Sequence, residues 1–232
     1  MMSAIRTAVE RLTRGWTLTR RLPNGARVVV TPDAQLKYLA RSFDDNLIAL
    51  ARDHVRQGDI VWDVGANCGI FAFSCAHAAR VIAIEADPFL CSILQRSIVY
   101  GDAPVSLVCG AVFSSPGLAE FSIAMRGRAG NHISGIQAST QTGGSRAQLV
   151  VPTVTLDSLI ERCGAPNLVK IDIEGAELDA LQGASRLLNE VRPIIYMESG
   201  DETREAVQSI LRRYNYKYES VDHSNWLCTP LT

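Results

Sequence analysis

Five apolar segments that alternate with helix-like segments are the feature of this sequence that most limits its fold. They occupy residues 60–66, 80–86, 105–113, 168–174 and 192–199. None of them shows the polar alternation of a strand with one wet face, so each is expected to be covered on both sides. Strands of this kind, separated by helices, form a parallel sheet with right-handed crossovers. The sequence therefore predicts an α/β fold, a doubly wound and mostly parallel sheet with helices on both faces.

Helix signals fill the gaps between these segments. Asp87 is a good N-cap and Pro88 suits the first helical position, so a helix is expected from there to about Tyr100. The other expected elements are helices over residues 43–57, 69–79 and 202–213, a helix from the fourth strand to Leu188, a turn and strand at 21–31, and a closing pair of strands at 217–229.

The length of 232 residues fits one domain with a full core. Residues 1–58 are expected to be a lead-in and cap, and residues 59–232 a Rossmann-like core. Residues 114–157 interrupt the alternation with SSPG, RGRAGNHISG and QTGGS, which predicts an inserted hairpin with a mobile loop at the ligand edge. The arginine-rich residues 1–21 predict the solvated face of a capping helix, with binding to a membrane surface or a partner as the alternative.

Composition excludes some classes of protein and partner. No apolar run approaches the ~20 residues that a membrane span needs, and an apolar content of 47% excludes disorder. With 23 basic and 24 acidic residues the net charge is −1, so no broad surface for nucleic acid is expected. The six cysteines have no CxxC or zinc spacing, and we expect them to be reduced, buried and structural. These features predict a cytoplasmic protein that acts on a small or uncharged substrate.

A glycine-rich turn, VWDVGANCGIF, follows the first segment. The dinucleotide fingerprint GxGxxG needs a glycine where this chain has Asn67, so a nicotinamide enzyme is disfavoured. Asp63 suits a positive group of a ligand, and Glu85 at the end of the next strand can accept hydrogen bonds from both hydroxyls of a ribose. With close backbone approach at Gly65 and Gly69, and a helix N-terminus for a carboxylate, these acids point to S-adenosylmethionine. A purely structural turn is the alternative.

A second group of charged residues lies in KIDIEGAE, residues 170–177. Lys170, Asp172 and Glu174 alternate on an expected strand, so they are expected to share one face near its carboxyl end. Two carboxylates there could take a proton from a hydroxyl or hold a divalent ion. Stabilisation at a helix N-terminus explains Glu177 well. It explains Asp172 poorly, because Asp172 interrupts an apolar strand.

Five motifs in order, DVGANCGIF, AIEADP, VPTVTLDSL, LVKIDIEGAELDALQG and RPIIYMES, resemble the FkbM family of S-adenosylmethionine-dependent methyltransferases. The resemblance covers about residues 22–228. It implies a class I methyltransferase fold with a seven-stranded sheet, and methylation of hydroxyls on natural products or sugars. The cofactor-binding residues that it implies are Asp63, Gly65, Ala66, Asn67, Gly69, Ile70, Glu85, Ala86, Ala111 and Asp172, with Ala111 beside the adenine. Asp172, Glu174 and Glu198 are implied to face the substrate.

The reaction expected from these residues is a one-step attack of a substrate oxygen on the methyl group, helped by a general base. Asp172 is the first candidate for the base, Glu174 the second, and His132 in the inserted loop the third. The expected acceptor is a small molecule or sugar, and nucleic acid is not an expected partner. No metal is predicted, although a divalent ion is compatible with the acids, and the oligomeric state is open, a homodimer included. The alternatives are a methyltransferase that acts on RNA or protein, and a non-catalytic module that binds S-adenosylmethionine or another nucleotide.

Overall fold

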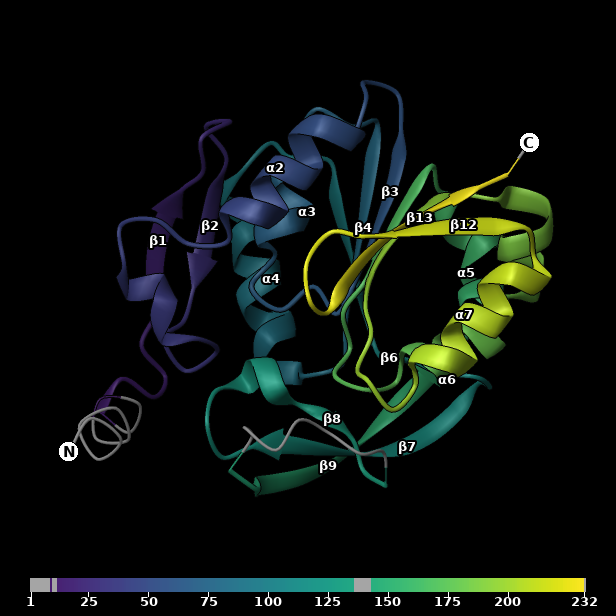
Figure 1. Cartoon of the computed structure of the whole chain (residues 1–232). Coiled ribbons are helices and arrows are strands. Elements are labelled where there is room, and N and C mark those ends of the chain that lie inside the picture. Colours follow the sequence, from purple (N-terminus) through teal and green to yellow (C-terminus); the bar gives the residue numbers. More distant parts are fainter. Residues whose placement is uncertain (1–8, 10–11, 136–142, 232) are drawn as a thin grey trace.

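The computed structural model describes residue 9 and residues 12–135 and 143–231 (Figure 1). Residues 1–8, 10 and 11 of the arginine-rich start, and residues 136–142 of the expected inserted loop, lie outside the described residues. No helix within the described ranges is long and apolar enough to cross a membrane.

A seven-stranded sheet forms the centre of the molecule, in the order β12-β13-β11-β10-β3-β4-β5 (Figure 1). Its strands are β3 (Ile60–Val64), β4 (Arg80–Glu85), β5 (Val105–Cys109), β10 (Leu168–Ile171), β11 (Ile194–Glu198), β12 (Tyr216–Ser220) and β13 (Asn225–Pro230). Neighbours from β11 through β5 pair in parallel, and β13 is antiparallel to both β11 and β12. The predicted doubly wound, mostly parallel sheet is therefore confirmed, as is the closing pair of strands.

The central strands are apolar because both of their faces are buried. In β4, Val81 packs into one core cluster and Ile82 into the other, and Val61 and Trp62 of β3 divide in the same way. Successive side chains of a strand point to opposite faces, so one continuous apolar run feeds two cores. The first core is covered by α2 (Asp45–His54), α3 (Ile70–Ser74) and α4 (Pro88–Tyr100). The second is covered by α5 (Leu156–Cys163), α6 (Glu177–Gln182), η4 (Leu187–Val191) and α7 (Arg204–Arg213).

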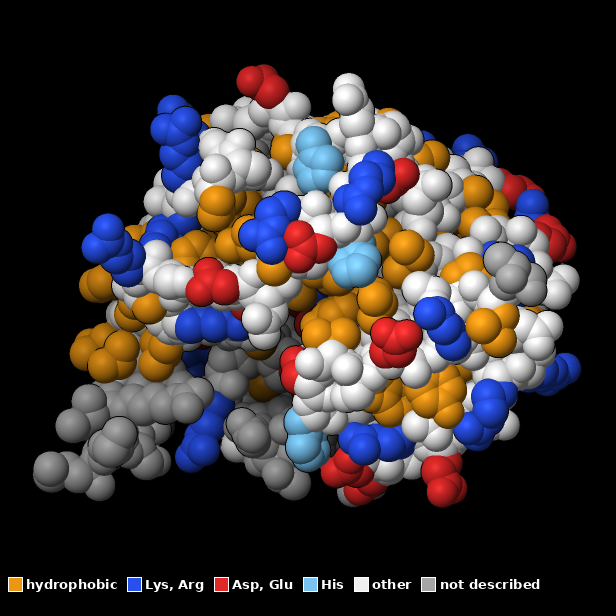
Figure 2. Space-filling model, turned by 45° about the horizontal axis from the view of Figure 1, so that its top comes forward, with side chains coloured by type: hydrophobic (Ala, Val, Ile, Leu, Met, Phe, Trp, Pro, Cys, Tyr) orange, Lys and Arg blue, Asp and Glu red, His pale blue; other side chains and the backbone are white. Residues whose placement is uncertain are grey.

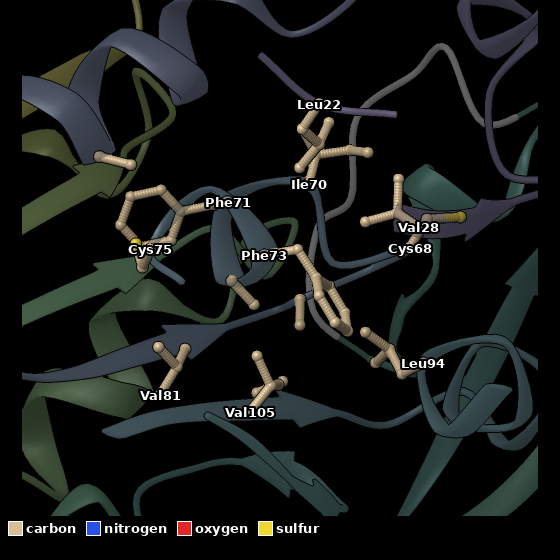
Figure 3. Packing of buried hydrophobic residues seen from close by; sticks show 14 of the residues in the cluster. Leu22, Val28, Cys68, Ile70, Phe71, Phe73, Cys75, Val81, Leu94 and Val105 are labelled. Atoms are coloured by element: carbon tan, nitrogen blue, oxygen red, sulfur yellow. The ribbon is translucent and has the colours of Figure 1, made fainter. Parts of the chain in front are cut away.

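Figure 3 shows the first core around α3. Phe71 and Phe73 project from this short helix above Val81 and Val105 of the sheet, and Phe73 lies beside Leu94 of α4. The helix is shorter than the expected 69–79, because the chain turns after Ser74. The loop before α3 is thus held by large buried side chains.

The expected strand 105–113 is divided between two sheets. Gly110 ends β5, and the chain then enters a four-stranded sheet of order β6-β9-β7-β8, hereafter the inserted sheet. Its strands are β6 (Ala111–Val112), β7 (Gly117–Ala124), β8 (His132–Ile133) and β9 (Ser145–Val154), and η2 (Arg128–Gly130) precedes β8. The antiparallel pairing of β7 with β9 confirms the predicted inserted hairpin.

The lead-in contains a hairpin of β1 (Leu18–Arg21) and β2 (Arg27–Val30), followed by η1 (Leu36–Leu39). It is fixed to the first helical layer by hydrogen bonds. The side-chain amide of Asn24 donates to the carbonyl oxygen of Phe73 at 2.9 Å, and the backbone N–H of Val29 donates to Oγ of Ser97 at 2.8 Å. The residues after β2 therefore lie against the carboxyl edge of the central sheet.

Two expectations about the fourth strand and the helix after it were wrong in their bounds. The strand ends at Ile171 rather than at residue 174, because Glu174 has a left-handed backbone with φ 52°. The helix expected up to Leu188 is split into α6 and the π-helical turn η4. All six cysteines are free thiols, as expected, but Cys109 at the end of the edge strand β5 is exposed rather than buried.

Candidate active site

A cavity of 340 Å³ opens where β3, β4, β10 and β11 end, between the inserted sheet and the lead-in. Its volume is at the small end of the range for small-molecule sites, about 300–1,000 Å³. The predicted site residues that line it are Asp63, Gly65, Ala66, Asn67, Ile70, Glu85, Ala86, Ala111, Asp172, Glu174 and Glu198. Gly69 and His132 are the predicted site residues that do not line it.

Asp63, at the end of β3, has a cationic partner inside the chain. It is the register partner of Lys170 on β10, and the Nζ of Lys170 lies 3.1 Å from its Oδ1. Its Oδ2 accepts the backbone N–H of Ala72 at 3.1 Å. Burial lowers the pKa of Lys170, but the charges of Asp63 and Asp172 outweigh this effect and raise that pKa above its usual value. Asp63 therefore pairs with the charged side chain of Lys170. We had expected Asp63 to pair with a positive group of the ligand instead.

The two glycines of the turn are required by the chain's own packing. Gly65 has φ 75°, and a Cβ on it would lie 1.9 Å from the carbonyl oxygen of Asp172. Gly69 has φ 86°, and its Cβ would lie 2.7 Å from a methyl carbon of Leu94. The close approach expected at these positions is thus made by other parts of the protein. Gly65 also lines the cavity, whereas Gly69 serves the packing of α3 against α4.

Glu85, at the end of β4, is a buried carboxyl held by two backbone donors. The N–H of Asn67 lies 2.8 Å from Oε2, and that of Asp87 lies 2.9 Å from Oε1. Burial raises the pKa of Glu85 to about 7, although both hydrogen bonds favour the ionised form. Oδ1 of Asn67 and Oε1 of Gln35 are buried without a partner among the described residues, and both residues line the cavity. All of these oxygens are acceptors, so the cavity suits a ligand with several hydrogen-bond donors.

Three carboxyl groups meet at another part of the cavity wall, and we call Asp172, Glu174 and Glu198 the carboxylate cluster. One oxygen from each lies within 4.8 Å of the others. Burial, reinforced by the charges of its neighbours, raises the pKa of Glu174 to about 8. Burial and the charge of Asp172 raise the pKa of Glu198 to about 7. Oδ2 of Asp172 also lies 3.4 Å from Nζ of Lys170. Such a group could share protons or hold a divalent cation.

The predicted candidate base His132 is not brought to the cavity. Its neighbours Asn131 and Ile133 line the cavity, and side chains alternate along an extended chain, so His132 is directed to the other side. Its Nδ1 lies 3.1 Å from the carbonyl oxygen of Gly130. The structure therefore leaves Asp172 and Glu174 as the predicted bases that line the cavity.

Several lining residues were missed because they carry no motif. Gln35 and Tyr38 come from the lead-in, and Phe121, Arg128 and Ile133 come from the inserted sheet and its loop. The inserted segment was expected at the ligand edge and the lead-in only as a cap, and nothing in either sequence identifies which side chains face the cavity. Phe121 and Ile133 pack in one apolar cluster with Ala111, and these side chains suit a flat aromatic group.

Figure 2 shows how charged side chains are distributed over one face of the molecule. Blue and red side chains are interspersed there, with apolar side chains between them. This distribution agrees with the net charge of −1.

The family is decided by a model described as the methyltransferase FkbM domain, which matches residues 63–218. This chain belongs to the FkbM methyltransferase family. The match begins at Asp63 and runs through the glycine turn, Glu85 and the carboxylate cluster to β12. The resemblance inferred from the motifs is therefore confirmed.

Three individual proteins are similar to this chain in sequence or in fold. Hexuronic acid methyltransferase AglP of Haloferax volcanii is 29% identical over 154 residues, which are 66% of this chain and 61% of that protein. The chain thus spans less than two thirds of that relative. Two solved structures share the fold with TM-scores of 0.50. Precorrin-6y C5,15-methyltransferase of Geobacter metallireducens is 12% identical, over 82% of this chain and 90% of that one. An FkbM methyltransferase of Methylobacillus flagellatus is 17% identical, over 85% and 58%.

Proposed function

We propose that this chain is an S-adenosylmethionine-dependent O-methyltransferase that acts on a hydroxyl group of a sugar or a sugar-containing small molecule. The observation that carries the proposal is the position of Glu85 and the carboxylate cluster on the wall of one cavity, in a chain with an FkbM methyltransferase domain. The Haloferax relative, whose name states a hexuronic acid, supports a sugar as the acceptor.

The lining residues fit the parts of this cofactor. Glu85 would accept hydrogen bonds from the ribose hydroxyls, and the apolar wall beside Ala111 would hold the adenine. The orphan oxygens of Asn67 and Gln35 would accept from the ammonium group, in place of Asp63, which Lys170 already neutralises. The bound cofactor supplies a methyl group on a positively charged sulfur, which the surrounding carboxylates favour.

Asp172 remains our candidate for the general base. Its side chain is 37% exposed, so it can meet an acceptor, and Lys170 fixes it from the buried side. During methyl transfer from a bound cofactor, Asp172 would take the proton of the acceptor hydroxyl, and Glu198 lies close enough to share it. A base of this kind contributes about 10²–10⁴-fold to the rate. Glu174, with a pKa of about 8, is mostly protonated at neutral pH and would donate a hydrogen bond to a second oxygen of the acceptor.

The test has a binding step and a transfer step. Titration calorimetry with S-adenosylmethionine, S-adenosylhomocysteine and NAD is expected to show binding of the first two ligands only. Methyl transfer from labelled S-adenosylmethionine is then measured on a panel of hexuronic acids, their glycosides and the matching neutral hexosides. NAD binding alone would refute the cofactor assignment. Cofactor binding without transfer to any sugar, but with transfer to RNA or protein, would refute the acceptor assignment. Cofactor binding without transfer to any acceptor would favour a non-catalytic module.

A further inference from the structure

A buried ion cluster joins three separate segments beside the cavity, and we call Asp33, Asp87 and Arg128 the clamp. Asp33 lies in the lead-in after β2, Asp87 caps α4, and Arg128 belongs to the loop between β7 and β8. Nε of Arg128 donates to Oδ2 of Asp33 at 2.8 Å, and its Nη1 donates to Oδ2 of Asp87. Asp33 and Asp87 are 6% and 1% exposed, so both charges depend on this guanidinium.

Two further side chains complete the hydrogen bonding of the clamp. Arg146 of β9 donates to both oxygens of Asp33, at 2.8 and 2.9 Å. The amide nitrogen of Asn131 donates to Oδ2 of Asp87 at 2.7 Å, while its oxygen accepts the N–H of Ala124 at 2.9 Å. Two arginines thus balance two aspartates in a buried place. Burial raises the pKa of Asp33, but the hydrogen bonds from Arg146 and Arg128 outweigh this effect and hold that pKa below its usual value.

Backbone contacts hold the same segments together. The N–H of Arg128 donates to the carbonyl oxygen of Asp33 at 2.9 Å, and a Cβ on Gly127 would lie 2.8 Å from the carbonyl oxygen of Ala34. The guanidinium of Arg128 stacks over the ring of Phe89 on α4, 4.3 Å from its centroid. The arginine is therefore fixed in one place by both charge and packing.

The residues next to the clamp form the two cavity walls that the core fold does not supply. Gln35 follows Asp33 by two residues, and Ala129, Asn131 and Ile133 follow Arg128. Arg128 itself lines the cavity. On the core side, Asp87 follows Glu85 by two residues, and its N–H is one of the two donors that orient the Glu85 carboxylate. The clamp thus connects the cavity wall from the lead-in and the cavity wall from the loop after β7 to Glu85, the acid assigned to the ribose.

We propose that Arg128 is a positioning residue for the nucleoside end of the cofactor. It acts by holding the loop between β7 and β8, together with the lead-in, against Glu85 and α4. The proposal rests on the proposed function, since the nucleoside is that of S-adenosylmethionine. A cluster that served stability alone would affect unfolding and leave the affinity of the folded protein for its ligands unchanged. A cluster that shapes the nucleoside end weakens every ligand with an adenosine group by the same factor.

The test compares Arg128→Ala and Arg128→Lys with the control Arg186→Ala. Arg186 also bridges two acids, Glu161 and Glu190, but it is 45% exposed. Calorimetry measures the affinity of each variant for S-adenosylhomocysteine and for 5′-methylthioadenosine, which lacks the amino-acid end, and melting curves follow the ligand-free proteins. Arg128→Ala is expected to weaken both ligands equally, by about tenfold or more, because losing one partner of a buried charge pair has large effects. Arg128→Lys keeps the charge without the fork and should lie between Arg128→Ala and the wild type.

Two results would overturn the inference. One is an Arg128→Ala protein that binds both ligands like the wild type, whatever its melting temperature. The other is weakening of S-adenosylhomocysteine alone, which would place Arg128 at the amino-acid end. If Arg128→Ala does not fold, Asp33→Asn and Arg128→Lys are measured in the same way, and unchanged affinity in both refutes the clamp. A wild type that binds neither ligand refutes the proposed function itself, before any variant is compared.

Discussion

The protonation of Glu85 offers a quantitative test of the cofactor site. This carboxyl is buried at the end of β4, and burial raises its pKa to about 7. In the proposed complex both ribose hydroxyls donate to it, so the ionised form is the one that binds. Acidification should therefore weaken binding of the nucleoside in a range where ordinary carboxyl groups do not titrate.

The size of the effect follows from the fraction of Glu85 that is ionised. With a pKa of about 7, roughly nine tenths is ionised at pH 8 and roughly one tenth at pH 6. The apparent dissociation constant scales inversely with the competent fraction, so it should rise about tenfold from pH 8 to pH 6. This corresponds to about 1.4 kcal/mol of binding free energy.

The assay is calorimetric titration with 5′-methylthioadenosine at pH 6, 7 and 8, because this ligand has a ribose but lacks the amino-acid end, whose α-amino and carboxyl groups could titrate. Glu85→Gln is the matched control. It should bind more weakly than the wild type at pH 8 and with little dependence on pH. A flat wild-type profile would refute the assignment of Glu85 to the ribose. The same pH dependence in Glu85→Gln would show that another group carries it.

Three further predictions concern catalysis, packing and stability. Asp172→Asn should lower the rate of methyl transfer by about 10²-fold or more, while the affinity for S-adenosylhomocysteine stays near the wild-type value. Kinetic and calorimetric measurements on Asp201→Asn, at an exposed aspartate, are the control. Equal activity of the two variants would exclude Asp172 as the base. Gly65→Ala should cost more than about 3 kcal/mol of unfolding free energy or prevent folding, since its Cβ would overlap a backbone oxygen, whereas Gly200→Ala, with open space around it, should be neutral in urea titrations. The ligand-free protein should lose stability between about pH 5 and pH 8, because the folded state has raised pKa values at Glu85, Glu174 and Glu198, and it therefore holds protons that the unfolded chain releases; urea midpoints that rise over this range would contradict those values.

The sheet could be predicted from sequence because burial on both faces leaves a clear pattern. Val81 and Ile82 serve different cores, and between Arg80 and Glu85 their strand therefore has no polar position to confuse with a surface strand. The inserted sheet could be predicted only as a hairpin. The step of the chain from β5 into β6 occurs at Gly110, inside an apolar run that reads as one strand. A change of sheet leaves hydrophobicity unchanged, so periodicity cannot detect it.

A cofactor-binding residue could be predicted from sequence where its role follows from its position at the end of a strand. Glu85 is such a residue, and the structure places it on the cavity wall. Asp63 is different, because its partner Lys170 is 107 positions away and becomes a neighbour only through the order of the strands. The sequence pattern also predicted that Lys170, Asp172 and Glu174 share a strand face. The strand in fact ends at Ile171, and Glu174 joins the cluster through its left-handed backbone.

Lys170 connects the two halves of the proposed reaction. Its Nζ lies 3.1 Å from Asp63, 3.2 Å from the carbonyl oxygen of Gly65 and 3.4 Å from Asp172. The loop that would hold the cofactor and the carboxylate that would receive the acceptor's proton are thus bound to one buried cation. The close packing of Gly65 against the backbone of Asp172 also holds this loop and this carboxylate next to each other. An in-line transfer depends on holding the methyl carbon and the attacking oxygen within a few tenths of an ångström. In the proposed reaction, the pairing of β3 with β10 would set that spacing.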